Sequence, residues 1–165
     1  MKDAFRPEVI LRALERFEVA YVLIGGLAAT IHGSPHVTTD VDITPAMSES
    51  NMNRLSAALK HLKARVRSES AMDGLPFDDT GASLATVEFW NLTTSAGALD
   101  LTFLPAGTTG YDDLIADAIE LDILGVRVPV ASLADVIRSK QAADRPKDRL
   151  TLPTLRRLLE EGDGR

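Results

Sequence analysis

The sequence contains no cysteine and few aromatic residues. Disulfide bonds and thiolate metal sites are therefore excluded, and the composition is compatible with a reducing cytoplasm. No apolar run approaches the roughly 18 residues of a membrane-spanning helix. The first residues carry Lys2, Asp3 and Arg6 and do not resemble a signal peptide. We therefore expect a cytoplasmic protein with no membrane partner.

The composition is that of an ordinary globular protein. The chain has 165 residues, of which 45% are hydrophobic and 25% are charged, enough apolar material for a sizeable core. This length predicts one domain over residues 1–165, with a core at about 7–130 and a helical C-terminal part at about 131–160.

The net charge of −6 argues against a general nucleic-acid binder. The charge is uneven, however. Residues 51–68 contain five Lys or Arg and no acid, and residues 138–157 contain seven Lys or Arg against two Asp. These basic stretches suit a polyanionic ligand such as a triphosphate or RNA, although two solvated helix faces would give the same pattern.

Hydrophobic periodicity predicts alternating helices and strands. We expect helices over residues 7–18, 27–32, 48–63, 111–120, 133–143 and 147–160. Strands are predicted over residues 20–24, 38–43, 64–67, 84–92, 98–104 and 126–130. The runs 84–92 and 98–104 form a predicted hairpin, residues 70–82 a long surface loop, and Pro129 favours an edge strand at 126–130.

Three aspartates inside apolar, strand-like runs are the strongest chemical feature: Asp40 and Asp42 in TTDVDI, and Asp100 in ALDLTF. Residues i and i+2 of a strand share a face, with Cα atoms about 6–7 Å apart. Like charges this close repel one another unless a cation lies between them, and Mg²⁺ prefers carboxylate oxygens. Asp100 on a neighbouring strand would complete a two-metal clamp. The alternative is that each Asp occupies a solvent-facing position of a one-sided sheet.

Gly25 and Gly26 follow a buried strand and precede a short helix. Glycines allow a phosphate group to approach the backbone, and a helix start offers free N–H groups. A Gly-Gly pair alone could be a tight turn, so its weight comes from the neighbouring Asp40 and Asp42.

The stretch VLIGGLAATIHGSPHVTTDVDI resembles the signature of the DNA polymerase β-like nucleotidyltransferase superfamily, with thirteen residues between Gly26 and Asp40. Asp100 matches the third acid of that pattern. The resemblance implies an α+β nucleotidyltransferase fold, with a mixed, mostly antiparallel sheet flanked by helices and followed by C-terminal helices. It also implies that Asp40, Asp42 and Asp100 are catalytic and metal-binding, and that Gly25 and Gly26 cradle phosphates.

The segment DVIRSKQAADRPKDRLTLPTL resembles small bacterial members related to the AbiEii toxins and the minimal nucleotidyltransferases. This match implies that Lys140 and Lys147 bind the nucleotide, with Arg145 and Asp148 bordering or bracing the site; an ordinary charged helix junction is the alternative. The sequence departs from many relatives at His36, where they carry Arg, and at Gly26, where a Ser occurs.

The implied activity is Mg²⁺-dependent transfer of a nucleoside monophosphate from an NTP to a hydroxyl acceptor, with two Mg²⁺ ions at the site. The expected acceptor is RNA such as tRNA, or a protein, in a toxin–antitoxin pair with a cognate partner. One alternative is a small-molecule (antibiotic) transferase, whose cationic acceptor would need acids such as Glu88, Asp73, Asp78 or Asp79. Another is a non-catalytic antitoxin or binding module of the same fold.

Overall fold

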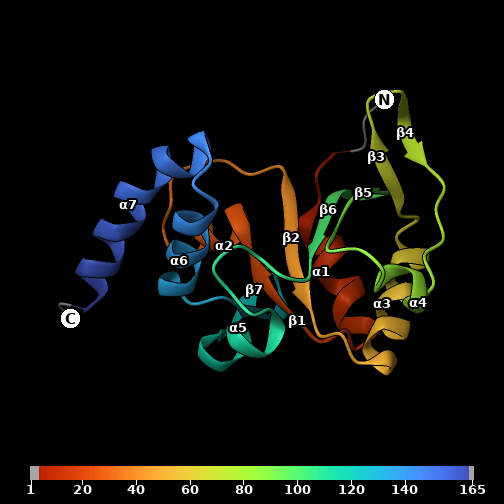
Figure 1. Cartoon of the computed structure of the whole chain (residues 1–165), viewed down its shortest axis with the longest axis horizontal. Helices are drawn as coiled ribbons and strands as arrows, with labels where there is room; N and C mark the ends of the chain where they lie inside the picture. Colours follow the sequence, from red (N-terminus) through yellow and green to blue (C-terminus); the bar gives the residue numbers. More distant parts are fainter. Residues whose placement is uncertain (1–3, 164–165) are drawn as a thin grey trace.

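The structure is a computed structural model that describes residues 4–163, and it has one mixed sheet with helices around it (Figure 1). The strands are β1 (Tyr21–Ile24), β2 (Asp40–Pro45), β3 (Arg65–Ser68), β4 (Ala71–Leu75), β5 (Phe89–Thr94), β6 (Gly97–Thr102), β7 (Ile119–Ile123) and β8 (Val126–Val130). The helices are α1 (Pro7–Arg16), α2 (Gly25–Ile31), α3 (Glu49–His61), α4 (Gly81–Leu84), α5 (Tyr111–Asp117), α6 (Leu133–Ala143) and α7 (Pro146–Asp163).

The sheet has the strand order β4-β3-β5-β6-β2-β1-β8-β7. The pairs β1–β8 and β2–β6 are parallel, and the remaining pairs are antiparallel. The α+β class and the mixed, mostly antiparallel sheet predicted from the sequence are confirmed. The parallel pair β2–β6 joins strands that are far apart in the chain, so it brings the two Asp-containing segments side by side.

Side-chain alternation gives the strands around β2 two different faces. The residues buried on one face are apolar, namely Val41, Ile43, Leu92, Leu99 and Leu101. They belong to the same core cluster as the buried residues of α1 and α3. Alternate residues of these strands project from the other face. They include Asp40, Asp42 and Asp100, which are part-exposed. This leaves the acids at the edge of the core.

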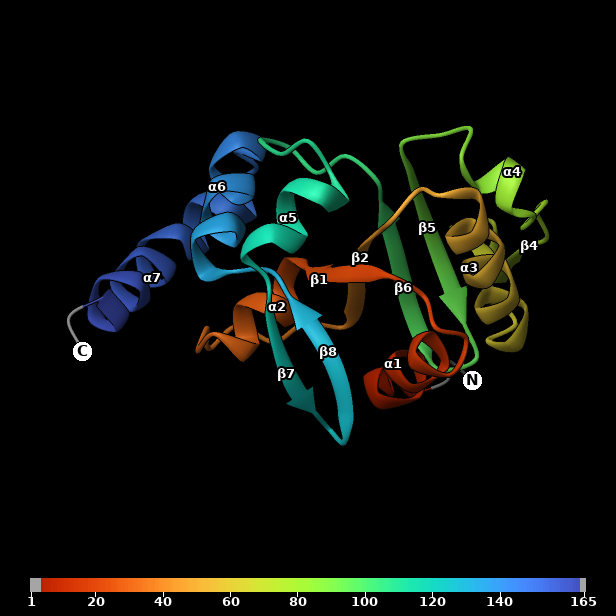
Figure 2. The ribbon, with the colours of Figure 1, turned by 90° about the horizontal axis from the view of Figure 1, so that it is seen from below.

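Helices α6 and α7 gather at one end of the molecule, away from α3 and α4, and α7 projects from that end (Figures 1 and 2). Ser132 is the N-cap of α6, and its hydroxyl oxygen accepts a hydrogen bond from the backbone N–H of Asp135 at 3.1 Å. The break predicted at Asp144 to Pro146 separates the two helices, and Asp144 adopts a left-handed conformation. Among residues 4–163, no helix is both long and apolar enough to cross a membrane.

The structure corrects the prediction for residues 111–130. The expected helix ends at Asp117, and Ile119–Ile123 forms β7, which pairs with β8 along its whole length. Leu124 and Gly125 both have positive φ (54° and 85°), which suits a tight hairpin turn. Strand β8 is therefore an inner strand between β1 and β7, and the edge position expected from Pro129 is wrong. The alternation of Ile119, Leu121 and Ile123 was the signal for a strand.

The expected loop and strand between residues 70 and 92 are also corrected. Residues 71–75 form β4, which pairs with β3, and residues 81–84 form the short helix α4, capped by Thr80. Strand β5 begins at Phe89 and not at residue 84. The predicted hairpin is confirmed as β5–β6, with a register from Phe89–Thr102 to Thr94–Gly97.

Candidate active site

Gly25 is the first residue of α2 and follows β1 directly. Its φ is +73°, a region that L side chains rarely adopt. A Cβ at this position would lie 2.8 Å from Cγ of Asp42 and would contact its Oδ2 atom even more closely. Glycine is therefore required at position 25 for two reasons, namely the positive φ of its backbone and the close approach of the Asp42 carboxylate.

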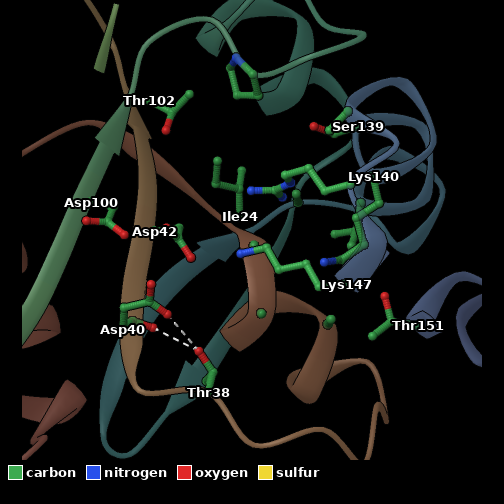
Figure 3. Close-up of a pocket in the computed structure, with 18 of the residues that line it drawn as sticks. Ile24, Thr38, Asp40, Asp42, Asp100, Thr102, Ser139, Lys140, Lys147 and Thr151 are labelled. Carbon is green, nitrogen blue, oxygen red and sulfur yellow. Dashed lines mark hydrogen bonds between the residues drawn. The ribbon is translucent and has the colours of Figure 1, made fainter. Parts of the chain in front are cut away.

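Gly26 faces the segment that leads into β2. A Cβ at Gly26 would lie 3.0 Å from the hydroxyl oxygen of Thr38. That hydroxyl donates to Oδ1 of Asp40 at 3.0 Å, so Thr38 helps to hold the first acid in place. Figure 3 shows this contact between the two labelled side chains. The two glycines thus lie against the groups that position Asp40 and Asp42.

The three acids come together through the parallel pairing of β2 and β6. Asp42 and Asp100 are register partners, and Asp40 lies opposite Ala98 on the same pair of strands. One carboxylate oxygen from each acid lies within 4.8 Å of the others. The three aspartates therefore form one cluster with three oxygen donors from two strands.

Burial and mutual repulsion make this cluster hard to ionise fully. Burial, followed by the charges of Asp40 and Asp100, raises the pKa of Asp42 to about 7. Burial also raises the pKa of Asp100, although the Arg67 guanidinium acts in the opposite direction. Two partly buried carboxylates with raised pKa values beside a third acid are the electrostatic setting in which a divalent cation is favourable.

The donor set fits a hard divalent cation. It consists of carboxylate oxygens alone, the ligand type that Mg²⁺ takes, and it leaves room for substrate oxygens in the adjoining cavity. No sulfur or imidazole belongs to the cluster, which distinguishes it from a structural zinc site within the described residues.

A cavity of about 730 Å³ adjoins the acids. It extends from the β1–α2 junction to the α6–α7 junction, so it joins the core sheet to the C-terminal helices. The predicted residues on its lining are Gly25, Gly26, His36, Asp40, Asp42, Asp100, Lys140, Arg145 and Lys147. The structure therefore brings every predicted site residue except Asp148 to one cavity.

Lys147 is the lysine oriented toward the acids. Its positive charge lowers the pKa of Asp42, against the stronger effects that raise it. In Figure 3 its side chain extends from α7 toward Asp42, while Lys140 lies further along the same wall. The Nζ atom of Lys140 is 3.6 Å from Asp148 Oδ1, so this lysine is partly neutralised within the protein.

Asp148 braces the junction of α6 and α7. It is fully buried, and its carboxylate accepts hydrogen bonds from the Arg145 Nε (2.7 Å) and Nη2 (3.2 Å) atoms. Burial alone would raise the pKa of Asp148, but these hydrogen bonds lower it below the usual value. Its position agrees with the bracing role that the sequence resemblance implied.

Three residues at the site were not predicted from the sequence. Thr38 holds Asp40, as described, and Arg67 donates to Asp100 Oδ1 at 2.7 Å. Asn91 is the register partner of Asp100 on β5 and lines the cavity. Arg67 belongs to the basic stretch at 51–68, but its partner is two strands away, and no short motif connects the two.

Comparison with protein-family models finds none that matches this sequence, and comparison with curated proteins also finds no match. Solved structures do match. The lincosamide antibiotic adenylyltransferase LnuA, solved with lincomycin, aligns over 94% of this chain and 99% of its own, with 14% identity and a TM-score of 0.62. ANT(2")-Ia, solved with adenylyl-2"-tobramycin, aligns over 90% and 84%, with 18% identity and a TM-score of 0.57.

A third similar structure is that of TM1012 from Thermotoga maritima, a candidate nucleotidyltransferase. It aligns over 96% of this chain and 97% of its own, with 21% identity and a TM-score of 0.52. The sequence resemblance to the nucleotidyltransferase superfamily therefore has a counterpart in three dimensions, whereas the finer likeness to AbiEii-related members stays a prediction. At these identities the likeness concerns the fold, and the chain has the nucleotidyltransferase fold.

Proposed function

We propose that the protein transfers a nucleoside monophosphate from an NTP to a hydroxyl acceptor, with pyrophosphate as the leaving group. The observation that carries the proposal is the convergence of Asp40, Asp42 and Asp100 at a cavity that also contains Lys140 and Lys147. Acids on one wall and cations on the other suit a metal-bound triphosphate. The shared fold with LnuA and ANT(2")-Ia supports the same reaction class.

Gly25 and Gly26 line the cavity at the β1–α2 junction, next to Asp42 and Thr38, and the phosphates would bind along this part of the wall. Lys147 extends toward the acids from the opposite side, and Lys140 lies further along the same wall (Figure 3). These two lysines would offset triphosphate charge and hold it in line with the acceptor, since positioning and charge neutralisation are the main protein contributions to phosphoryl-type transfer.

Asp40, Asp42 and Asp100 would together hold Mg²⁺, two ions when an NTP is bound. The ions would neutralise charge on the triphosphate and lower the pKa of the acceptor hydroxyl. Asp100 lies on β6, the strand of the pair nearer to β5 and β3, and its raised pKa suits a group that receives a proton.

RNA is the acceptor class that we favour. On the side of Asp100 away from the lysines, strands β5 and β3 present exposed Phe89, Asn91, Arg65 and Arg67. The aromatic ring and the amide on this open sheet face suit the bases of a single strand. The two guanidinium groups are bonded within the sheet, but they give this face a positive charge that suits phosphates. Membership of a toxin–antitoxin pair, with a cognate partner, stays a prediction from the sequence.

A small-molecule acceptor is the second candidate. It is favoured by the likeness to LnuA over nearly the full length of both chains, since that protein modifies an antibiotic. A cationic acceptor would need acids beyond the cluster, but the cavity lining, taken from the described residues, contains none of Glu88, Asp73, Asp78 and Asp79. It does contain Asp135, whose carboxylate is paired with Arg138 at 3.0 Å. Glu88 instead lines a separate cavity of about 640 Å³, and Asp79 lies 3.6 Å from Lys60.

The test is incubation of the protein with each α-³²P-labelled NTP, Mg²⁺ and either total RNA or a panel of lincosamides and aminoglycosides. We expect label in RNA, and loss of labelling in Asp42→Asn with the fold retained. Asp117→Asn, an exposed acid on α5, is the matched control and should label normally. Label in an antibiotic would establish the second candidate.

Full activity of Asp42→Asn would contradict the metal role of the acids. Absence of both labelling and NTP binding in the wild-type protein would instead indicate a non-catalytic binding module with this fold.

A further inference from the structure

Arg67 reaches across the sheet to the acid cluster. Val66 of β3 pairs with Leu92 of β5, so the next register position places Arg67 opposite Asn91, which is itself the partner of Asp100. The guanidinium Nη2 atom spans this row and donates to Asp100 Oδ1 at 2.7 Å. It also donates to the backbone carbonyl of Leu92 at 3.0 Å, which fixes its position.

This contact comes from the side of Asp100 opposite to the other two acids. Strand β6 lies between β5 and β2, so Arg67 approaches from β3 while Asp40 and Asp42 lie on β2. In Figure 3 one carboxylate oxygen of Asp100 points toward Asp42 and the other points away from it. Arg67 can thus hold one oxygen and leave the second free to face the cluster.

The ion pair is better shielded than an ordinary surface pair. The Asp100 side chain is 13% exposed and the Arg67 side chain 41% exposed. A guanidinium at hydrogen-bond distance from a mostly buried carboxylate is a charge-assisted contact, stronger than a contact between two exposed groups. The Arg67 guanidinium therefore offsets a substantial part of the negative charge of the acid cluster.

We propose that Arg67 is a positioning and charge-balancing residue of the three-acid cluster, and that it limits how strongly the cluster attracts a divalent cation. Without a cation, its guanidinium compensates part of the negative charge. With a cation, it repels that ion and retains one oxygen of Asp100. This proposal rests on the metal role of the acids in the proposed function.

Loss of Arg67 should strengthen the binding of a divalent cation, whereas loss of a native contact usually weakens it. Removing Arg67 takes away a fixed positive charge next to the cluster, so a divalent cation should bind more tightly although a native contact is lost. The metal-free protein should become less stable for the same reason, because the guanidinium that compensates part of the negative charge of the three acids is then missing. A merely structural contribution of Arg67 would lower both stability and metal affinity.

The experiment measures Mn²⁺ binding by electron paramagnetic resonance, without nucleotide, for wild type, Arg67→Ala, Arg67→Lys and Arg65→Ala. Arg65 is the matched control, because it lies on the same strand but its guanidinium donates to the backbone carbonyls of Asp73 and Gly74. We expect Arg67→Ala to bind Mn²⁺ about three- to tenfold more tightly, a change of roughly 0.7–1.4 kcal/mol. Arg67→Lys retains the charge and should stay near wild type, as should Arg65→Ala.

Thermal unfolding provides the second measurement. In the presence of a chelator, Arg67→Ala should unfold at a lower temperature than wild type, and saturating Mg²⁺ should narrow the difference. Unchanged or weaker Mn²⁺ binding by Arg67→Ala, with normal binding by wild type, would overturn the proposal. Absence of Mn²⁺ binding by wild type would instead overturn the metal site of the proposed function, so the two failures are distinguishable.

Discussion

Gly25 lies directly against the carboxylate of Asp42, so that a Cβ at position 25 would stand 2.8 Å from Asp42 Cγ. The backbone that starts α2 and the acid at the centre of the cluster are therefore fitted to each other. Because Ile24 and Asp42 are also register partners on β1 and β2, neither group can move independently of the other.

Gly25→Ala should damage the site more than the fold. The positive φ costs roughly 1–2 kcal/mol for a residue with a Cβ, and the new methyl group would displace the Asp42 carboxylate. We expect at least a tenfold loss of Mn²⁺ affinity. Gly125→Ala is the matched control: its φ is +85°, but its nearest neighbour is the Arg12 Nη2 atom at 3.8 Å. Equal metal affinity in the two variants would contradict the close-fit interpretation.

Asp42 should make the metal-free protein less stable as the pH rises. Burial and the neighbouring acids raise its pKa from the ordinary 3.8 to about 7 in the folded chain, so the folded state binds more protons between these values. The stabilisation is complete below about pH 4 and is lost as the pH rises through 7.

Asp42→Asn removes this dependence. With a chelator present, the variant should unfold at nearly the wild-type temperature at pH 4 and roughly 4–8 °C higher at pH 8, as a stability gain of about 2 kcal/mol would produce. Circular dichroism melts across this pH range measure the difference. If the unfolding temperatures of the wild type and Asp42→Asn differ by the same amount at all pH values, Asp42 titrates normally in the folded state.

Lys147 should contribute more to NTP binding than Lys140. Its side chain extends toward the acids, whereas Lys140 lies 3.6 Å from the carboxylate of Asp148. Calorimetry with a non-hydrolysable NTP analogue and Mg²⁺ should show that Lys147→Ala lowers the affinity for the analogue about tenfold and that Lys140→Ala lowers it less. Arg156→Ala, an exposed residue of the same helix outside the cavity lining, is the control. The reverse order of the two lysines would refute this assignment.

Asp148→Ala should destabilise the junction of α6 and α7. The change leaves Arg145 and Lys140 without their buried partner, and breaking a buried ion pair from one side costs about 3–5 kcal/mol. Asp144→Ala removes a bidentate pair with Arg149 that is exposed, which is worth at most about 1 kcal/mol. Urea unfolding gives the free energy of unfolding of both variants. A similar decrease in the two would contradict the bracing role of Asp148.

The sequence allowed the acid cluster to be predicted because each of its members lies in a local pattern. The alternation around Asp40 and Asp42 defines one face of a strand, and Asp100 interrupts an apolar run in the same way. Their meeting depends on the parallel pairing of β2 and β6, whereas the sequence indicated only that Asp100 lies on a neighbouring strand.

The rest of the site depends on contacts that have no local signal. Arg67 and Asp100 are 33 positions apart and on strands separated by β5, so their pairing follows from sheet order. Strand β7 was missed because an amphipathic helix and a short alternating strand follow each other closely at residues 111–123. Both the Arg67–Asp100 contact and strand β7 therefore depend on the pairing of strands in the folded protein, which the local sequence pattern does not determine.

The parallel alignment of β2 and β6 also has a consequence for how the gene could change in length. Residues 46–96 lie between β2 and β6 in the chain and contain β3, β4 and β5, which extend the sheet beyond β6. Loops within this segment, such as residues 76–80 before α4, can accept inserted segments without shifting β2 and β6, the strands that carry the acids. The outer half-sheet can thereby diversify while the carboxylates are preserved, provided that Arg67 of β3 keeps its contact with Asp100.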